Sequence, residues 1–234
     1  IKPAGTYRVF AFGGSSTFDP FVSDDQTWVA RTGRRLAERS GRRIEAVNAG
    51  RYGYTTSEIL GLLQARVSRH QPDLVILYST YNDARAQVSP YYGRDQGPQL
   101  YGHPLTGLLL RHSALLTFLD FRLRYQWPTR SLYARIVPQD VKGLPVPEEH
   151  VRFMADSALR QSYLVAWYRR NVLSFVASAR IAGARVALVS QIVNPGDLKP
   201  EDALINAVLQ SVAEESGAAF IDLAAMAGSR PKED

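Results

Sequence analysis

Short apolar runs of strand length alternate with longer segments of helical periodicity along most of this chain of 234 residues. Such alternation favours a parallel β-sheet that is covered by helices on both faces. The expected strands are Tyr7–Phe12, Arg43–Ala49, Leu74–Tyr78, Val186–Ile192 and Ala219–Leu223. The expected helices are Asp24–Ser40, Thr55 to Val67, Glu148 to about Ala182, and the segment between Pro200 and Gly217.

Composition is that of an ordinary globular protein, with 45% hydrophobic and 21% charged residues. No apolar run approaches the roughly 20 residues needed to cross a bilayer. There are no cysteines, which excludes disulfides and thiolate metal sites. Because the first residue is Ile1 rather than methionine, we expect a segment of a longer chain, with any signal peptide or membrane anchor outside it.

Residues 84–147 interrupt the alternation and hold much of the positive charge. They contain eight basic and three acidic residues, a net charge of +5, against +6 for the whole chain. This charge indicates either a solvated surface or a face for anionic polymers or membranes. Nucleic acid is not expected, since no recognition motif accompanies the charge. The same segment is rich in aromatic residues such as Tyr91, Tyr92 and Trp127, which predict either a satellite core or a substrate-binding wall.

Three of the expected strands are followed by unusual polar or glycine-rich segments. These are Gly13-Gly14-Ser15-Ser16-Thr17, Asn48-Ala49-Gly50-Arg51-Tyr52-Gly53 and Thr80-Tyr81-Asn82-Asp83. The carboxyl ends of parallel strands meet at one edge of a sheet, where ligands bind. Taken singly, each segment is also compatible with a tight turn or a helix cap. The first lacks the lysine and the spacing of a phosphate-binding loop.

Together the three segments offer the groups that acyl transfer needs. Two glycines would let the chain turn sharply and leave the Ser15 hydroxyl exposed as a nucleophile. The backbone N–H groups of Ser15 and Gly53 and the side-chain amide of Asn82 could bind the oxygen that becomes negative in the transition state. The loss of one such donor raises a reaction barrier by roughly 2.7–4 kcal/mol.

In order and spacing, these motifs resemble the first three conserved blocks of the SGNH (GDSL-like) hydrolases. The resemblance covers residues 6–83 and resumes at 182–223. It implies that Ser15 is the nucleophile and that Gly53 and Asn82 complete the oxyanion hole. The family usually has glycine where this chain has Thr80, which would tilt the loop but leave the Asn82 donor in place.

A second departure from the family concerns the general base. The family carries Asp-x-x-His after its last strand, and no histidine follows Leu223 here. We expect that this motif lies beyond Asp234 and that no histidine within these residues contacts Ser15. The alternatives are recruitment of His103, His112 or His150, and loss of catalysis. The fourth histidine, His70, is expected on the wrong edge of the sheet.

We therefore predict one SGNH-like α/β domain over residues 1–234, with a basic, aromatic insertion at about 84–147 and its C-terminal catalytic segment missing. The fold is a three-layer sandwich with a flavodoxin-like parallel five-stranded sheet in the order 2-1-3-4-5. The expected function is that of a serine esterase acting on an acylated carbohydrate or lipid-like ester, without a cofactor or metal. The alternatives are a polysaccharide O-acyltransferase and a non-catalytic binding module. We expect an extracytoplasmic location, periplasmic or secreted.

Overall fold

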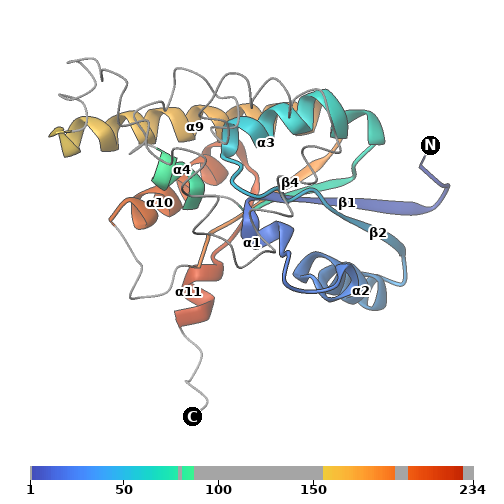
Figure 1. Ribbon diagram of the computed structural model, residues 1–234. Coiled ribbons are helices and arrows are strands. Elements are labelled where there is room, and N and C mark those ends of the chain that lie inside the picture. The colour runs from blue at the N-terminus through green and yellow to red at the C-terminus, as the bar shows by residue number, and fades with distance from the viewer. Residues whose placement is uncertain (1, 79–80, 87–154, 193–199, 229–234) are drawn as a thin grey trace, which may run out of the picture. The chain divides into compact units, whose positions relative to one another are not determined.

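The computed structural model describes residues 2–78, 81–86, 155–192 and 200–228, shown in colour in Figure 1. All of them belong to one compact unit, which combines Ile1–Tyr92 with Phe153–Asp234. The other unit, Gly93–Arg152, lies outside the described residues, as does nearly all of the expected insertion. The aromatic residues that predict a satellite core or a substrate-binding wall therefore lie outside the described residues.

Five parallel strands form a single sheet in the order β2-β1-β3-β4-β5, which confirms the predicted architecture. The strands are β1 (Thr6–Gly13), β2 (Arg43–Asn48), β3 (Leu74–Tyr78), β4 (Arg185–Val189) and β5 (Ala219–Ile221). Strand β1 lies between β2 and β3 and pairs with both, so that Phe10 is opposite Val47 and Val75. This order places the carboxyl ends of β2, β1 and β3 side by side.

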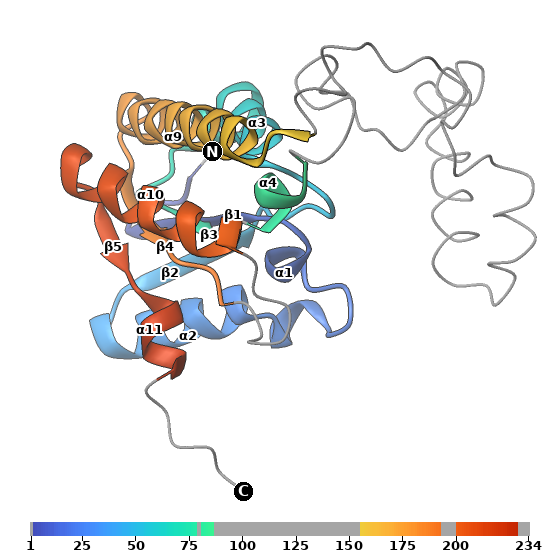
Figure 2. The ribbon, with the colours of Figure 1, turned by 90° about the vertical axis from the view of Figure 1, so that its left-hand side faces the viewer.

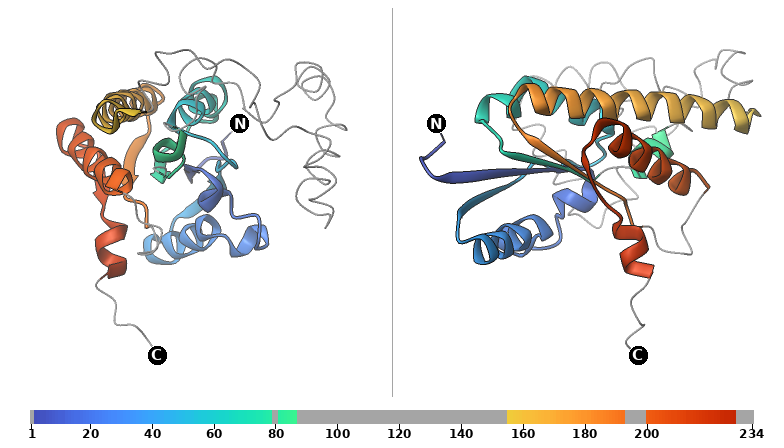
Figure 3. Two further views of the ribbon diagram at one scale, coloured as in Figure 1. Left: turned by 60° about the vertical axis from the view of Figure 1, so that its left-hand side comes forward. Right: turned by 180° about the vertical axis from the view of Figure 1, so that it is seen from behind.

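Helical elements follow the strands. They are α1 (Ser15–Phe18), η1 (Asp24–Gln26), α2 (Trp28–Ser40), α3 (Thr56–Leu62), η2 (Leu63–Val67), η3 (Ser68–His70), α4 (Tyr81–Ala86), α9 (Ser157–Ile181), α10 (Pro200–Ser216) and α11 (Leu223–Gly228). Figures 1 and 3 show α3, α9 and α10 on one face of the sheet, and α2 and α11 on the other. No helix in the described ranges combines the length and apolar character that a membrane crossing requires.

Two apolar clusters join these layers, because alternate strand residues face opposite sides of the sheet. The larger cluster includes Phe12 of β1, Leu188 of β4, Phe175 of α9 and Leu209 of α10, each at most 1% exposed. Phe12 and Phe175 meet edge to face, with ring centroids 5.2 Å apart. The smaller cluster joins alternate residues of β1, β3 and β4 to Val29 of α2.

Several predicted element boundaries are confirmed, because local capping chemistry sets them. The helix expected from Thr55 begins with a capping box that Thr55 and Glu58 form at the start of α3. Pro200 begins α10, and the glycines that follow α9 and α10, Gly183 and Gly217, have φ values of +82° and +66°. A positive φ at this position ends a helix in the left-handed conformation that glycine adopts without strain.

Other boundaries differ from the prediction. Helix α9 begins at Ser157 rather than Glu148, because Asp156 is extended and its carboxylate accepts a hydrogen bond from the Leu159 N–H. The segment expected as one helix from Asp24 is a 3-10 turn followed by α2, and Thr27 rather than an aspartate caps α2. The expected strand over Ala219–Leu223 ends at Ile221, since Leu223 begins α11.

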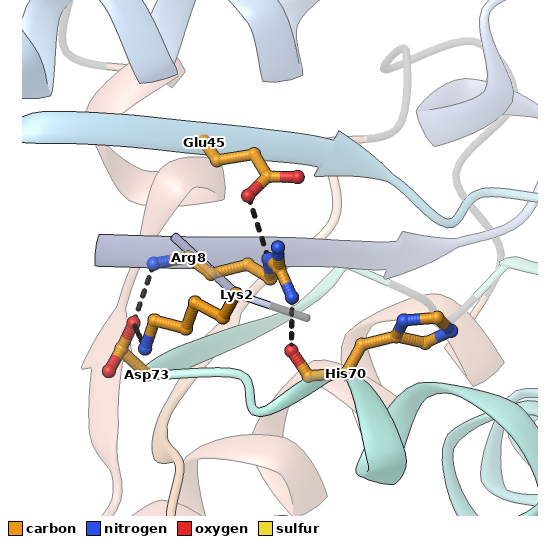
Figure 4. Close-up of polar contacts among 5 residues, drawn as sticks. All are labelled: Lys2, Arg8, Glu45, His70 and Asp73. Carbon is orange, nitrogen blue, oxygen red and sulfur yellow. Dashed lines mark hydrogen bonds and ion pairs between the residues drawn. The ribbon is translucent and has the colours of Figure 1, made fainter. Parts of the chain in front are cut away.

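A network of charged residues fastens the amino ends of β1, β2 and β3, at the edge opposite Ser15 (Figure 4). The Arg8 side chain, which is almost buried, donates hydrogen bonds to Glu45 at 2.8 Å and to the His70 carbonyl. The Asp73 carboxylate accepts the Arg8 backbone N–H at 2.6 Å and pairs with Lys2. Partial burial raises the pKa of Asp73, but the Arg8 N–H and the Lys2 ammonium outweigh it and leave the pKa below its usual value.

Candidate active site

The turn that carries Ser15 connects β1 directly to the single helical turn α1. The Gly14 carbonyl accepts hydrogen bonds from the backbone N–H groups of Thr17 and Phe18, at 3.1 and 3.0 Å. Ser15 is therefore the first residue of α1 and is partly exposed at the carboxyl edge of the sheet, the edge that faces the viewer in Figure 2.

A side chain at either of the two glycines before Ser15 would make close contacts with neighbouring atoms. A Cβ atom on Gly13 would lie 2.3 Å from the Tyr78 carbonyl oxygen of β3. A Cβ atom on Gly14 would lie 2.5 Å from Nδ2 of Asn82, while φ of Gly14 is an ordinary −82°. These close contacts are a further reason for glycine at both positions, beside the sharp turn that the sequence predicts.

The segment after β2 contacts the turn that carries Ser15. The Asn48 amide nitrogen donates a 2.7 Å hydrogen bond to the Thr17 carbonyl, and its oxygen accepts the Gly50 N–H at 2.9 Å. Gly50 packs directly on α1, since a Cβ atom there would lie 2.4 Å from the Phe18 nitrogen. Asn48 and Gly50 therefore fix the position of α1 relative to β2.

Gly53 lies further along this segment, in the exposed turn between Arg51 and Tyr54. Its φ is +75°, and no atom lies within 4 Å of the position that a Cβ would take. Glycine is thus required here for conformation rather than for space. Among the described residues, no group accepts a hydrogen bond from the Gly53 N–H or the Ser15 N–H.

Asn82 lies in the first turn of α4, the helix after β3. Its amide nitrogen donates a 2.8 Å hydrogen bond to the Tyr54 carbonyl and packs against Gly14. The structure therefore brings the Asn82 amide next to the residue that precedes Ser15 and next to the residue that follows Gly53. Thr80, where the SGNH hydrolases usually have glycine, lies outside the described residues.

The residue after Asn82 is a fully buried carboxylate, which the sequence analysis considered only as part of a turn or cap. Asp83 accepts hydrogen bonds from the Thr56 N–H, at 3.2 and 3.1 Å to its two oxygens, and from the Thr56 hydroxyl at 2.6 Å. Burial raises the pKa of Asp83 to about 7, although the hydrogen bonds from Thr56 act in the opposite direction. Asn82 and Asp83 together attach α4 to residues 54–56.

A fourth strand also contributes to this edge. Gln191, two residues after the end of β4, bonds both to Ser16 and to the first backbone N–H of α4. Gln191 belongs to none of the three motifs that the sequence indicates. Its position after β4 is nevertheless where ligand sites form, at the carboxyl ends of parallel strands.

No general base for Ser15 is found among the described residues. His70, the one histidine that they include, is exposed at the opposite edge of the sheet, with its ring centroid 6.3 Å from that of Phe10. The recruitment candidates His103, His112 and His150 lie outside the described residues. Within the same ranges, no group of three acidic or histidine side chains could hold a metal ion.

A sequence model described as the GDSL-like Lipase/Acylhydrolase family matches residues 11–234. No curated protein matches the chain. Solved structures with a similar fold include AlinE4, described as an SGNH-hydrolase family esterase, at 14% identity over 99% of this chain and 84% of that one, with a TM-score of 0.55.

Two further structures have comparable scores. One is the lipase/acylhydrolase from Enterococcus faecalis, at 17% identity over 96% of this chain and 80% of that one, with a TM-score of 0.54. The other is a variant of Axe2, an acetyl xylan esterase from Geobacillus stearothermophilus, at 15% identity over 96% and 81%, with a TM-score of 0.52. At these identities the solved structures establish the fold alone.

Proposed function

Because the chain belongs to the GDSL-like lipase and acylhydrolase family, we propose that it is a serine esterase that hydrolyses a carboxylic ester through an acyl-enzyme on Ser15. The observation that carries this proposal is the pair of contacts that the Asn82 amide makes, with Gly14 beside Ser15 and with Tyr54 beside Gly53. An amide held there can donate its second N–H toward the space in front of Ser15.

The proposed reaction begins when the Ser15 hydroxyl oxygen attacks the ester carbonyl carbon and its proton passes to a general base. The carbonyl oxygen becomes an oxyanion, which accepts hydrogen bonds from the Ser15 N–H, the Gly53 N–H and the Asn82 amide. Collapse of this intermediate expels the alcohol, which takes up the proton. Water then attacks the acyl-enzyme with the same groups and releases the acid.

The general base is the histidine of Asp-x-x-His in the SGNH hydrolases that the sequence resembles. Position argues against His70 in this role, since it lies at the opposite edge of the sheet from Ser15. A serine hydroxyl is a weak nucleophile without such a base, so the proposal requires one in the complete protein.

We propose an acylated carbohydrate or a lipid-like ester as the substrate, with no cofactor. The likeness to Axe2, named for its action on acetyl xylan, agrees with a short acyl group on a sugar. Water and a sugar hydroxyl are alternative acceptors for the same acyl-enzyme. Addition of a sugar alcohol to the assay would therefore separate an esterase from an acyltransferase by the product that forms.

The test compares the full protein with its Ser15→Ala variant on nitrophenyl esters of increasing acyl length. We expect Ser15→Ala to lower kcat at least 1,000-fold, as removal of a nucleophile does, and to leave the melting temperature unchanged, because Ser15 is partly exposed. Ser178→Ala, which removes a surface hydroxyl that bonds to Gln64, is the matched control. Unchanged turnover by folded Ser15→Ala protein would exclude Ser15 as the nucleophile, and an inactive complete protein would favour a binding module.

A further inference from the structure

The chain leaving β4 places a nearly buried amide side chain at the carboxyl edge of the sheet. Gln191 is only 7% exposed, and both of its backbone groups are held by one side chain of α10. The Asn206 oxygen accepts the Gln191 N–H at 3.0 Å, and the Asn206 amide nitrogen donates to the Gln191 carbonyl at 3.0 Å. The backbone of Gln191 is therefore held by Asn206, whatever hydrogen bonds the Gln191 side chain makes.

The side-chain amide of Gln191 bonds to two elements, α1 and α4, which follow the adjacent strands β1 and β3. Its oxygen accepts the Tyr81 backbone N–H of α4 at 2.8 Å, and its nitrogen donates to the Ser16 hydroxyl of α1 at 3.3 Å. Because a backbone N–H can only donate, the contact with Tyr81 fixes which end of the amide faces Ser16. Strand β3 lies between β1 and β4, so the side chain reaches across the end of β3.

The two atoms that Gln191 holds belong to the immediate neighbours of the proposed nucleophile and the proposed oxyanion donor. Ser16 follows Ser15 in α1, and Tyr81 precedes Asn82 in α4. We propose that Gln191 is a positioning residue, which sets the distance between the Ser15 turn and the Asn82 amide. This inference rests on the proposed esterase function.

A shift of an oxyanion donor affects the transition state more than the bound substrate, because the full negative charge exists only in the transition state. Methionine at position 191 keeps the length of the side chain but makes neither hydrogen bond. We therefore expect Gln191→Met to lower kcat about tenfold and to change KM less than twofold. A purely structural role for Gln191 would lower the melting temperature and leave kcat of the folded enzyme unchanged.

The matched control is Gln64→Met. Gln64 makes one side-chain hydrogen bond to a serine, at 2.9 Å to Ser178, and lies on the exposed surface between η2 and α9. We expect this variant to keep the kcat and KM of the wild-type protein. A fall in kcat with Gln64→Met as large as with Gln191→Met would overturn the inference, because glutamine-to-methionine substitution would then lower kcat even far from Ser15.

Tyr81→Pro provides a second route to the same question, in case Gln191→Met does not fold. Proline is tolerated as the first residue of a helix and has no N–H, so this variant removes the contact with Gln191 from the other side. We expect it to lower kcat by a similar factor, and the double variant to be no slower than the slower single variant. Wild-type kcat in folded Tyr81→Pro or Gln191→Met protein overturns the inference, as does a double variant whose two losses multiply.

The Ser15→Ala variant separates failure of this inference from failure of the proposed function. If Ser15→Ala is inactive while Gln191→Met keeps the wild-type kcat, only the role of Gln191 is refuted. If Ser15→Ala keeps the wild-type turnover, the esterase mechanism itself is refuted, and the positioning role falls with it.

Discussion

Alanine in place of Gly14 should displace the Asn82 amide without disturbing the fold. The new Cβ would lie 2.5 Å from Asn82 Nδ2, well inside van der Waals contact, and 3.6 Å from the Tyr54 carbonyl, which is ordinary contact. The atom in the way is the end of a side chain, so it can rotate aside. Since φ of Gly14 is −82°, alanine adds no strain in φ.

The size of the effect follows from what Asn82 loses. Rotation of its amide breaks the 2.8 Å hydrogen bond to Tyr54, which costs about 1 kcal/mol of folding free energy. Loss of the oxyanion donor raises the barrier by roughly 2.7–4 kcal/mol. We therefore expect kcat to fall roughly 100- to 1,000-fold, with a melting temperature close to that of the wild-type protein.

The assay is hydrolysis of nitrophenyl acetate by Gly14→Ala, Asn82→Ala and the double variant, with thermal melting of each. If Gly14→Ala acts by displacing the Asn82 amide, the double variant is no slower than Asn82→Ala alone, because Asn82→Ala has already removed the amide that alanine at position 14 would displace. Gly61→Ala is the control, since no atom lies within 4 Å of its Cβ position in α3. Wild-type kcat in Gly14→Ala, or losses that multiply in the double variant, would refute the assignment of Asn82.

Three further predictions concern stability. The pKa of Asp83 is about 7 in the folded protein against 3.8 for an ordinary aspartate, so its contribution to the free energy of unfolding falls as pH rises from 4 to 7, by about 4 kcal/mol in total. Asp83→Asn should remove this pH dependence, which urea unfolding from pH 4 to 8 measures. An equal pH dependence of the free energy of unfolding in the variant and the wild-type protein would contradict the prediction. Arg8→Met should cost about 2 kcal/mol of stability, since it removes charged hydrogen bonds to Glu45 and the His70 carbonyl, with kcat unchanged. Lys2→Ala, which breaks a partly exposed ion pair, should cost less than about 1 kcal/mol in the same denaturation assay.

The strands and their order could be predicted because each depends on a local signal or on a general rule. Apolar runs such as Leu74–Tyr78 are strands in the structure as expected, and the capping box at Thr55 and Glu58 begins α3. Hydrophobic periodicity predicts that helix α9 begins at Glu148. The helix begins at Ser157 instead, because Asp156 has an extended backbone. The start of α9 is therefore set by the capping side chain of Asp156 and not by the spacing of apolar residues.

The contacts around the candidate site were harder to predict, because they join residues far apart in the sequence. Gly14 and Asn82 are 68 positions apart, and nothing local indicates that the Asn82 amide occupies the space of a Gly14 side chain. The same holds for Gln191 and Ser16, whose contact depends on the order of strands β1, β3 and β4. The motifs identified the residue types at the sheet edge, whereas the strand order decided which of them touch.

Three amide side chains hold the proposed site together, and each binds backbone atoms of the segment that it positions. Asn48 bonds to the Thr17 carbonyl, Asn82 to the Tyr54 carbonyl, and Gln191 to the Tyr81 N–H. Every residue has a backbone C=O, and every residue except proline has a backbone N–H. A change of side chain at Thr17, Tyr54 or Tyr81 therefore leaves these hydrogen bonds possible, with the exception of proline at position 81. The three amide residues cannot be substituted so freely, because each hydrogen bond requires a polar side chain of a particular length. The geometry around Ser15 therefore depends on three residues that take no direct part in nucleophilic attack, and Asn82 alone among them is proposed to contact the reacting ester.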